Sequence, residues 1–211
     1  MKKVLTLLLL AFVMCQCNNQ TGQQNQSNEN SDRSKYPEKF TEDYIGTRAL
    51  NLAEKLCESD PYNVYTFNNS FTNEYGNLLK ESLALPEGID GDGPSAWQWI
   101  EFAGELCSMQ AIIDVKLNGN KAQVIWDSEY YGEDDLSLSF VNGEWLIDDV
   151  GNCSQKYMRD KIKESRKYYK SIDWLELIHE LEERGYNKED AVRASEDLRE
   201  QIETYFGNYP D

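Results

Sequence analysis

Carboxylates and tyrosines in one stretch of this chain have the chemistry needed for acid–base catalysis. Burial raises the pKa of a carboxyl group into a working range, and a neighbouring tyrosine can assist proton transfer. The candidates lie in or beside predicted strands: Asp114, Asp127, Glu129, Asp148, Asp149, Tyr130 and Tyr131. No motif selects any of them, so catalysis is kept as the alternative. Asp148 and Asp149, beside a strand end, are interpreted as a solvated or cap-forming pair.

His179 is the only histidine, which excludes histidine dyads and multi-histidine metal sites within one chain. We expect it to be a partly exposed helix residue. Asp90, Asp92 and Glu101 have the spacing of calcium ligands. However, Ser95 stands where such a loop needs a sharply turning glycine, so an Asp- and Gly-rich turn is the better interpretation. Phosphate-loop and nucleophile-elbow motifs are also missing, and we expect no metal and no cofactor.

The start of the chain has its own chemistry. Lys2 and Lys3 precede an apolar run over residues 4–14, which is shorter than the roughly 20 residues of a membrane-spanning helix. Cys15 and Cys17 follow directly. This start resembles a bacterial lipoprotein signal (1–17), with Cys17 as the favoured lipidated residue and Cys15 as the alternative. The resemblance implies a lipid-anchored protein of the cell envelope, at the outer membrane or facing the periplasm; a secreted protein is the alternative.

The other cysteines are Cys57, Cys107 and Cys153. Cys57 falls on the apolar side of a helical pattern and is expected to be a buried free thiol. Cys107 and Cys153 flank the predicted sheet. They form the predicted disulfide, which an oxidising envelope permits.

Four strands are the clearest structural pattern. They cover residues 111–117, 121–131, 136–140 and 144–150. Asn142 and Gly143 predict a two-residue primed turn into the last strand. Apolar residues at helical spacing predict helices over about 41–58, 64–83, 154–169, 174–184 and from Asn187 onward, with Thr41 and Asn187 as caps.

The predicted fold is therefore α+β, with helices packed on an antiparallel meander. Residues 18–37, which are rich in Asn, Gln and Ser, predict a flexible tether. The α+β domain is expected over 38–170, and a C-terminal helical hairpin over 171–211.

The order of these elements, with its Gly- and Pro-containing loop and the closing segment Asn142–Val150 (NGEWLIDDV), resembles the nuclear-transport-factor-two-like superfamily. The similarity extends over about 37–170, and the loop at residues 90–94 and the helix from Ser154 also resemble uncharacterised secreted and lipoprotein members. It implies a curved, cone-shaped sheet whose concave face is covered by helices, with a pocket at the wide end. Isomerase- or hydratase-type enzymes and non-catalytic binders share this shape, so fold does not decide the function.

Tryptophans fall into two groups around that expected pocket. Trp126 and Trp145 lie on strands beside apolar neighbours and are predicted to pack in the core. Trp97 and Trp99 follow the loop near the expected cone mouth, and pockets are lined by aromatic residues. The predicted contacts to a ligand or partner are Trp97, Trp99, Asp90 and Asp92.

The net charge of the chain limits the classes of molecule that it can bind. The net charge is −17, and residues 38–153 hold 6 Lys and Arg against 22 Asp and Glu. Such a surface repels nucleic acid and anionic lipid, so the membrane is reached through the lipid anchor. Solubility explains the acidity most simply, whereas a basic partner is the functional interpretation. The leading hypothesis is a non-enzymatic binder of a protein partner, such as an immunity-type inhibitor of a basic toxin, or of a small ligand.

One segment is basic instead: residues 154–170 hold 7 Lys and Arg against 2 Asp and Glu. Five of these cations share one predicted helix face: Lys156, Arg159, Lys163, Arg166 and Lys170. We expect this stripe to dock against C-terminal acids, namely Glu176, Glu180 and Glu183.

Overall fold

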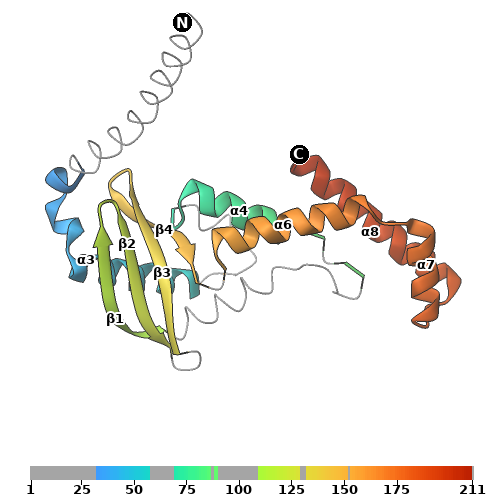
Figure 1. The fold of residues 1–211 in the computed structure, drawn as a ribbon, viewed down its shortest axis with the longest axis horizontal. Coiled ribbons are helices and arrows are strands. Elements are labelled where there is room, and N and C mark those ends of the chain that lie inside the picture. Colours follow the sequence, from blue (N-terminus) through green and yellow to red (C-terminus); the bar gives the residue numbers. More distant parts are fainter. Residues whose placement is uncertain are drawn as a thin grey trace, which may run out of the picture.

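The computed structural model describes residues 32–57, 69–86, 88–89, 109–128, 132–151 and 153–210. It is an α+β structure in which a four-stranded antiparallel sheet occupies one end and helices extend from it to the other (Figure 1). The strands are β1 (Met109–Asn118), β2 (Lys121–Ser128), β3 (Gly132–Val141) and β4 (Glu144–Val150). The helices are η1 (Pro37–Phe40), α3 (Glu42–Cys57), α4 (Asn73–Leu83), α6 (Gln155–Lys170), α7 (Trp174–Glu183) and α8 (Lys188–Asn208).

The predicted meander is confirmed, because the strand order is β1-β2-β3-β4 and every neighbour is antiparallel. Asn142 and Gly143 have φ angles of 53° and 88°, as a primed turn requires. Asn142 tolerates this left-handed backbone better than most side chains, and glycine adopts it without strain. The turn therefore fixes the register of β4 on β3.

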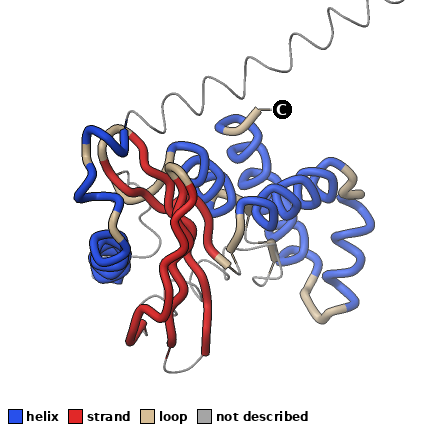
Figure 2. The backbone as a smooth tube through the Cα atoms, turned by 60° about the vertical axis from the view of Figure 1, so that its left-hand side comes forward, coloured by secondary structure: helices blue, strands red, loops and turns tan. Residues whose placement is uncertain are grey.

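Alternate strand residues build a core on one face of the sheet. Trp126 and Trp145 are both 0% exposed there, which confirms their predicted packing role. Phe40 of η1 lies on Trp145, with ring centroids 5.3 Å apart, and α3 runs across β1 and β2 (Figure 2). The predicted caps are also confirmed: Thr41 accepts a hydrogen bond from the backbone N–H of Tyr44, and Asn187 accepts one from Asp190.

Two segments differ from the prediction. The helix expected from residue 64 begins at Asn73 within the described residues, because Phe71 forms a parallel bridge with Ile147 and Thr72 caps the helix. The bridge is a contact between distant residues that helical spacing does not reveal. The end of the expected tether is also structured. Residues 32–35 are helical, and the ring of Tyr36 packs against that of Phe140 with a centroid-to-centroid distance of 5.8 Å.

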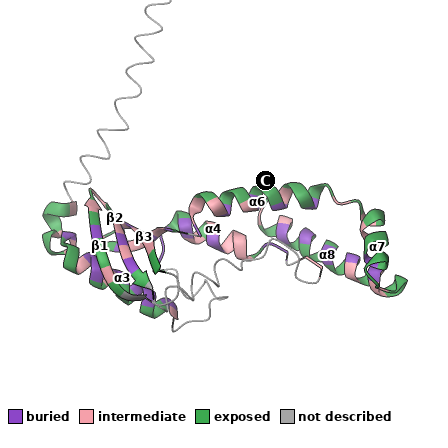
Figure 3. Cartoon of the chain, turned by 60° about the horizontal axis from the view of Figure 1, so that its bottom comes forward, coloured by how far each residue is buried: buried purple, intermediate pink, exposed green. Residues whose placement is uncertain are grey.

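Buried side chains form two clusters, and Figure 3 colours the buried residues purple on the strands and on the helices. The sheet cluster joins the inner face of the sheet to α3, Tyr75 of α4 and Met158 of α6. The helix cluster joins the second half of α6 to α8 and includes Tyr169 and Leu198. Leu78 packs against both clusters, so α4 and α6 connect the sheet to the C-terminal helices.

Candidate functional site

The outer face of the sheet carries polar side chains and is the candidate functional site. Strand register aligns Lys116, Gln123 and Ser137 in one row across β1, β2 and β3. The row beside it contains Val124 and Leu136, which are both 0% exposed on the inner face. This alternation is what a sheet with one buried and one solvated face requires.

A cleft of about 480 Å³ opens on this face between β2, β3, β4 and the first turn of α6. Asp148 is its best-connected side chain and is only 16% exposed. Its carboxylate accepts hydrogen bonds from the Ser139 and Thr72 hydroxyls, each at 2.9 Å. The Lys121 ammonium lies 3.3 Å away. Asp148 is thereby held in one position by three elements of the chain.

Asp149 has a structural role in the same cleft. Its carboxylate accepts the backbone N–H groups of Val150 at 3.0 Å and Gln155 at 2.8 Å, so it satisfies a free donor at the start of α6. Lys156 and Arg159 line the cleft beside it. With Asp148 and Lys121, they give the cleft charges of both signs, which suits a small ligand bearing both donors and acceptors. Sequence reasoning missed this cleft, because it depends on Thr72 reaching β4.

An acidic patch lies at the end of the same face, where β2 turns into β3. Strand register places Asp127 opposite Glu133, and Asp114 and Asp135 on either side of Ile125. Lys116 is 3.7 Å from Asp114, and Gln123 donates to Asp135 at 3.0 Å. We define the acidic patch as Asp114, Asp127, Glu133 and Asp135.

The carboxylates that were considered for catalysis and that the structure describes therefore have other positions and roles. Asp114 and Asp127 lie at the surface, Asp148 is hydrogen-bonded in the cleft, and Asp149 caps α6. Asp114 is 50% exposed and paired with Lys116, and Asp127 is exposed in the patch. The inner face of the sheet is filled by Trp126, Leu138 and other core side chains. Glu129, Tyr130 and Tyr131 lie outside the described residues.

The cysteine predictions are wrong for both described cysteines. Cys57 is disulfide-bonded, whereas Cys153 is a buried free thiol. The predicted Cys107–Cys153 disulfide is therefore not formed, and the partner of Cys57 lies outside the described residues. Cys153 is instead packed in the sheet cluster, where the Tyr75 hydroxyl donates to its backbone carbonyl oxygen at 2.9 Å. Burial raises the pKa of the Cys153 thiol to about 11.

The remaining predicted site residues lie outside the described ranges. They are Cys15, Cys17, Cys107, Asp90, Asp92, Trp97 and Trp99. Their roles in lipidation and in ligand or partner contact stay predictions.

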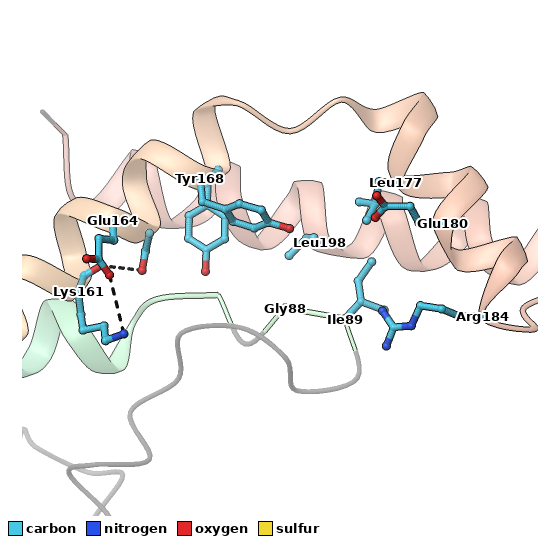
Figure 4. A pocket seen from close by; sticks show the side chains of 11 residues that line it. Gly88, Ile89, Lys161, Glu164, Tyr168, Leu177, Glu180, Arg184 and Leu198 are labelled. Atoms are coloured by element: carbon cyan, nitrogen blue, oxygen red, sulfur yellow. Dashed lines mark hydrogen bonds and ion pairs between the residues drawn. The ribbon is translucent and has the colours of Figure 1, made fainter.

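A second hollow, of about 500 Å³, lies between α6, α7 and α8 beside residues 88–89 (Figure 4). Tyr168, 54% exposed, and Leu198 provide apolar surface. Lys161 and Glu164 form an ion pair at one end, 3.8 Å apart, and Arg184 lies at the other. This hollow belongs to the helical part of the molecule, and none of its described lining residues lies on the outer face of the sheet.

The basic stripe does not dock where the sequence suggested. Arg159 pairs with Glu74, and Arg166 lies 2.7 Å from Glu81, so both partners belong to α4. The prediction of Glu176, Glu180 and Glu183 as partners is wrong; Glu183 instead lies 3.7 Å from His179, whose side chain is 73% exposed. Proximity along the chain favoured α7, but packing places α4 against α6.

Comparison with known protein families, curated proteins and solved structures finds no match for this chain. Within the described residues, no helix combines the length and apolar character needed to cross a bilayer. In the same ranges, no cluster of three or more His, Cys, Asp and Glu residues is arranged to hold a metal ion.

Proposed function

We propose that this protein is a lipid-anchored protein of the bacterial cell envelope that binds a partner without catalysing a reaction. The acidic patch carries the proposal. Its four carboxylates, three of them exposed and Asp135 half-buried, stand on a sheet whose other face is packed, so the sheet holds them in a fixed arrangement. Such a surface speeds encounter with a basic partner and fixes its orientation. An immunity-type inhibitor that masks a basic toxin is one form of this function.

The envelope location is supported by chemistry at two places. The start of the chain resembles a lipoprotein signal, with acylation at Cys17 or at Cys15. The disulfide of Cys57 is a separate observation, and structural disulfides persist in oxidising compartments. Together they favour a mature chain that resides outside the cytoplasm.

For the fold, we propose a relationship to the nuclear-transport-factor-two-like superfamily. The position of α3 across the sheet supports it. Register shifts after Ile112 and Ser137 also support it, because bulges bend strands. A curved, cone-like sheet followed by an α7–α8 hairpin is the arrangement we infer. The filled inner face favours a binder over an isomerase or hydratase with an internal pocket.

A small ligand is the second candidate, and the cleft around Asp148 favours it. Lys121 and Arg159 line the same cleft as two carboxylates. Such a site suits a zwitterionic small molecule that both donates and accepts hydrogen bonds. The acidic patch lies along the sheet from this cleft, so the two candidates predict different residues.

Capture of partners from envelope extracts tests the proposal. Wild-type protein should retain a basic protein at low salt and release it at high salt, since screening weakens attraction between exposed charges. The variant Asp127→Asn/Glu133→Gln should retain much less. Glu196→Gln/Glu203→Gln removes the same charge from exposed positions of α8 and should retain as much as wild type. Equal capture by both variants would contradict a binding role for the acidic patch. Capture of no protein at any salt concentration would favour binding of a small ligand.

A further inference from the structure

A basic groove of about 660 Å³ runs between α4 and α6 and ends at Pro210. We define it by its cations, which are Arg159, Lys163, Arg166, Lys167 and Lys170. Among the described residues that line it, Glu81 is the single acid, while Leu78 and Ile162 provide an apolar floor. A groove of this charge is unexpected in a chain of net charge −17, and of its five cations Arg159 alone also lines the sheet-face cleft.

The two arginines of the groove are already engaged within the protein. Arg166 donates to the Tyr205 hydroxyl at 3.2 Å, to Glu81 at 2.7 Å and to the Tyr209 carbonyl at 2.8 Å. Arg159 pairs with Glu74. These contacts join α6 to α4 and α8, so they give the groove a fixed shape.

The lysines form the outward-facing rim. Lys163 and Lys167 are exposed and stand four residues apart on α6, so they project from the same side of the helix. Neither has a carboxylate within ion-pair distance among the residues that the structure describes. Their positive charge is therefore directed to solvent.

We propose that this basic groove docks on the anionic surface of a lipid bilayer. Lysine stems cover apolar surface while their ammonium groups reach the headgroups, and a cationic rim over an apolar floor matches the headgroup–acyl boundary. The groove is open along α6, which fits an extended surface better than a small enclosed anion. This docking deepens the proposed function, on which it rests, because a lipid anchor brings the domain to the bilayer.

The position of the basic groove in the fold supports a bilayer as its binding surface. In Figure 1, α4, the C-terminal end of α8 and the first described residues lie on the upper side of the molecule, whereas the β2–β3 end that carries the acidic patch lies on the lower side. A bilayer on the groove side would leave the acidic patch directed away from anionic lipid. The partner-binding face would then be presented outward.

Vesicle sedimentation of the full chain tests the proposal. The measured quantity is the ratio of partition onto phosphatidylglycerol-containing vesicles to partition onto pure phosphatidylcholine vesicles, so that any lipid anchor contributes equally to both. Each lysine near an anionic surface contributes about five-fold to binding, so Lys163→Gln/Lys167→Gln should lower the ratio by about 25-fold. The control Lys188→Gln/Arg193→Gln, which removes two exposed cations of α8, should leave the ratio within about two-fold of wild type.

Four results would overturn the proposal. The ratio could be unaffected by the groove variant, or fall equally in the control. Competition by soluble glycerol phosphate, with no preference for vesicles, would assign the groove to a free phosphate ester instead. Salt-sensitive self-association abolished by the groove variant would assign it to the acidic surface of a second copy. Loss of partition onto neutral vesicles, with the ratio intact, would count against the lipid anchor but not against the groove.

Discussion

Cys153 is kept reduced by its surroundings. It is 2% exposed, and it lies in the sheet cluster beside Tyr75, where burial and the nearby charge of Asp149 disfavour the thiolate. The thiolate is the reactive form of cysteine, so a thiol held in this way resists disulfide exchange. Cys57, at the last turn of α3, is instead disulfide-bonded. Sequence position near the sheet could not distinguish these two fates, because the direction of each side chain decides them.

This arrangement predicts a specific pH dependence. The pKa of Cys153 rises from 9.0 to about 11 in the folded protein. The folded state therefore favours the protonated thiol, and its contribution to stability is complete below pH 9 and is lost as pH rises through about 11. Urea unfolding from pH 8 to pH 11 should show a steeper loss of unfolding free energy in wild type than in Cys153→Ala, by on the order of 2 kcal/mol. Parallel pH profiles would show that the thiol ionises equally easily in both states.

At the scale of elements, patterns between sequence neighbours were predictable and distant contacts were not. The meander, the Asn142-Gly143 turn and the Thr41 and Asn187 caps depend on local geometry, and the structure confirms them. The late start of α4 depends on the bridge between Phe71 and Ile147. The cleft, the partners of the basic stripe and the cysteine pairing likewise depend on which elements pack together.

The contacts of α4 with α6 include two arginine–glutamate pairs that should differ in strength. Arg166 and Glu81 are only 17% and 21% exposed, and Arg166 also meets Tyr205 and Tyr209. Arg159 and Glu74 are 48% and 64% exposed. Arg166→Ala removes the cation that faces the largely buried Glu81 carboxylate, which keeps only the Tyr205 hydroxyl as a donor at 3.0 Å, and should lower the unfolding free energy by about 2–4 kcal/mol.

Arg159→Ala is the matched control from the same two helices. An exposed pair contributes only about 0–1 kcal/mol. Urea unfolding of both variants measures the difference, and equal losses would show that the Arg166 contacts do not stabilise the junction of α4, α6 and α8.

At the scale of the whole molecule, two clusters of buried side chains share two helices. The sheet cluster packs beneath the inner face of the sheet, whose outer face carries the cleft and the acidic patch. The helix cluster packs α8 against the second half of α6. Leu78 of α4 and the helix α6 contribute side chains to both clusters and so connect them. The partner surface is supported by the sheet cluster, whereas the floor of the basic groove is formed by Leu78, which packs against both clusters, and by Ile162 of the helix cluster. The helix cluster can therefore open locally while the partner surface stays folded.

Hydrogen exchange should reveal this division. Leu198→Ala removes a side chain that is 3% exposed in the helix cluster, and Leu138→Ala removes one that is 0% exposed in the sheet cluster. Each should cost about 2–5 kcal/mol where its cavity forms. Leu198→Ala should speed amide exchange in α7, α8 and the second half of α6 while β2 and β3 stay protected, because regions with separate cores open separately. Leu138→Ala should speed exchange throughout the sheet. If Leu198→Ala instead accelerated exchange in the strands to the same extent, the two clusters would unfold as one cooperative unit, and α4 and α6 would couple the acidic patch directly to the basic groove.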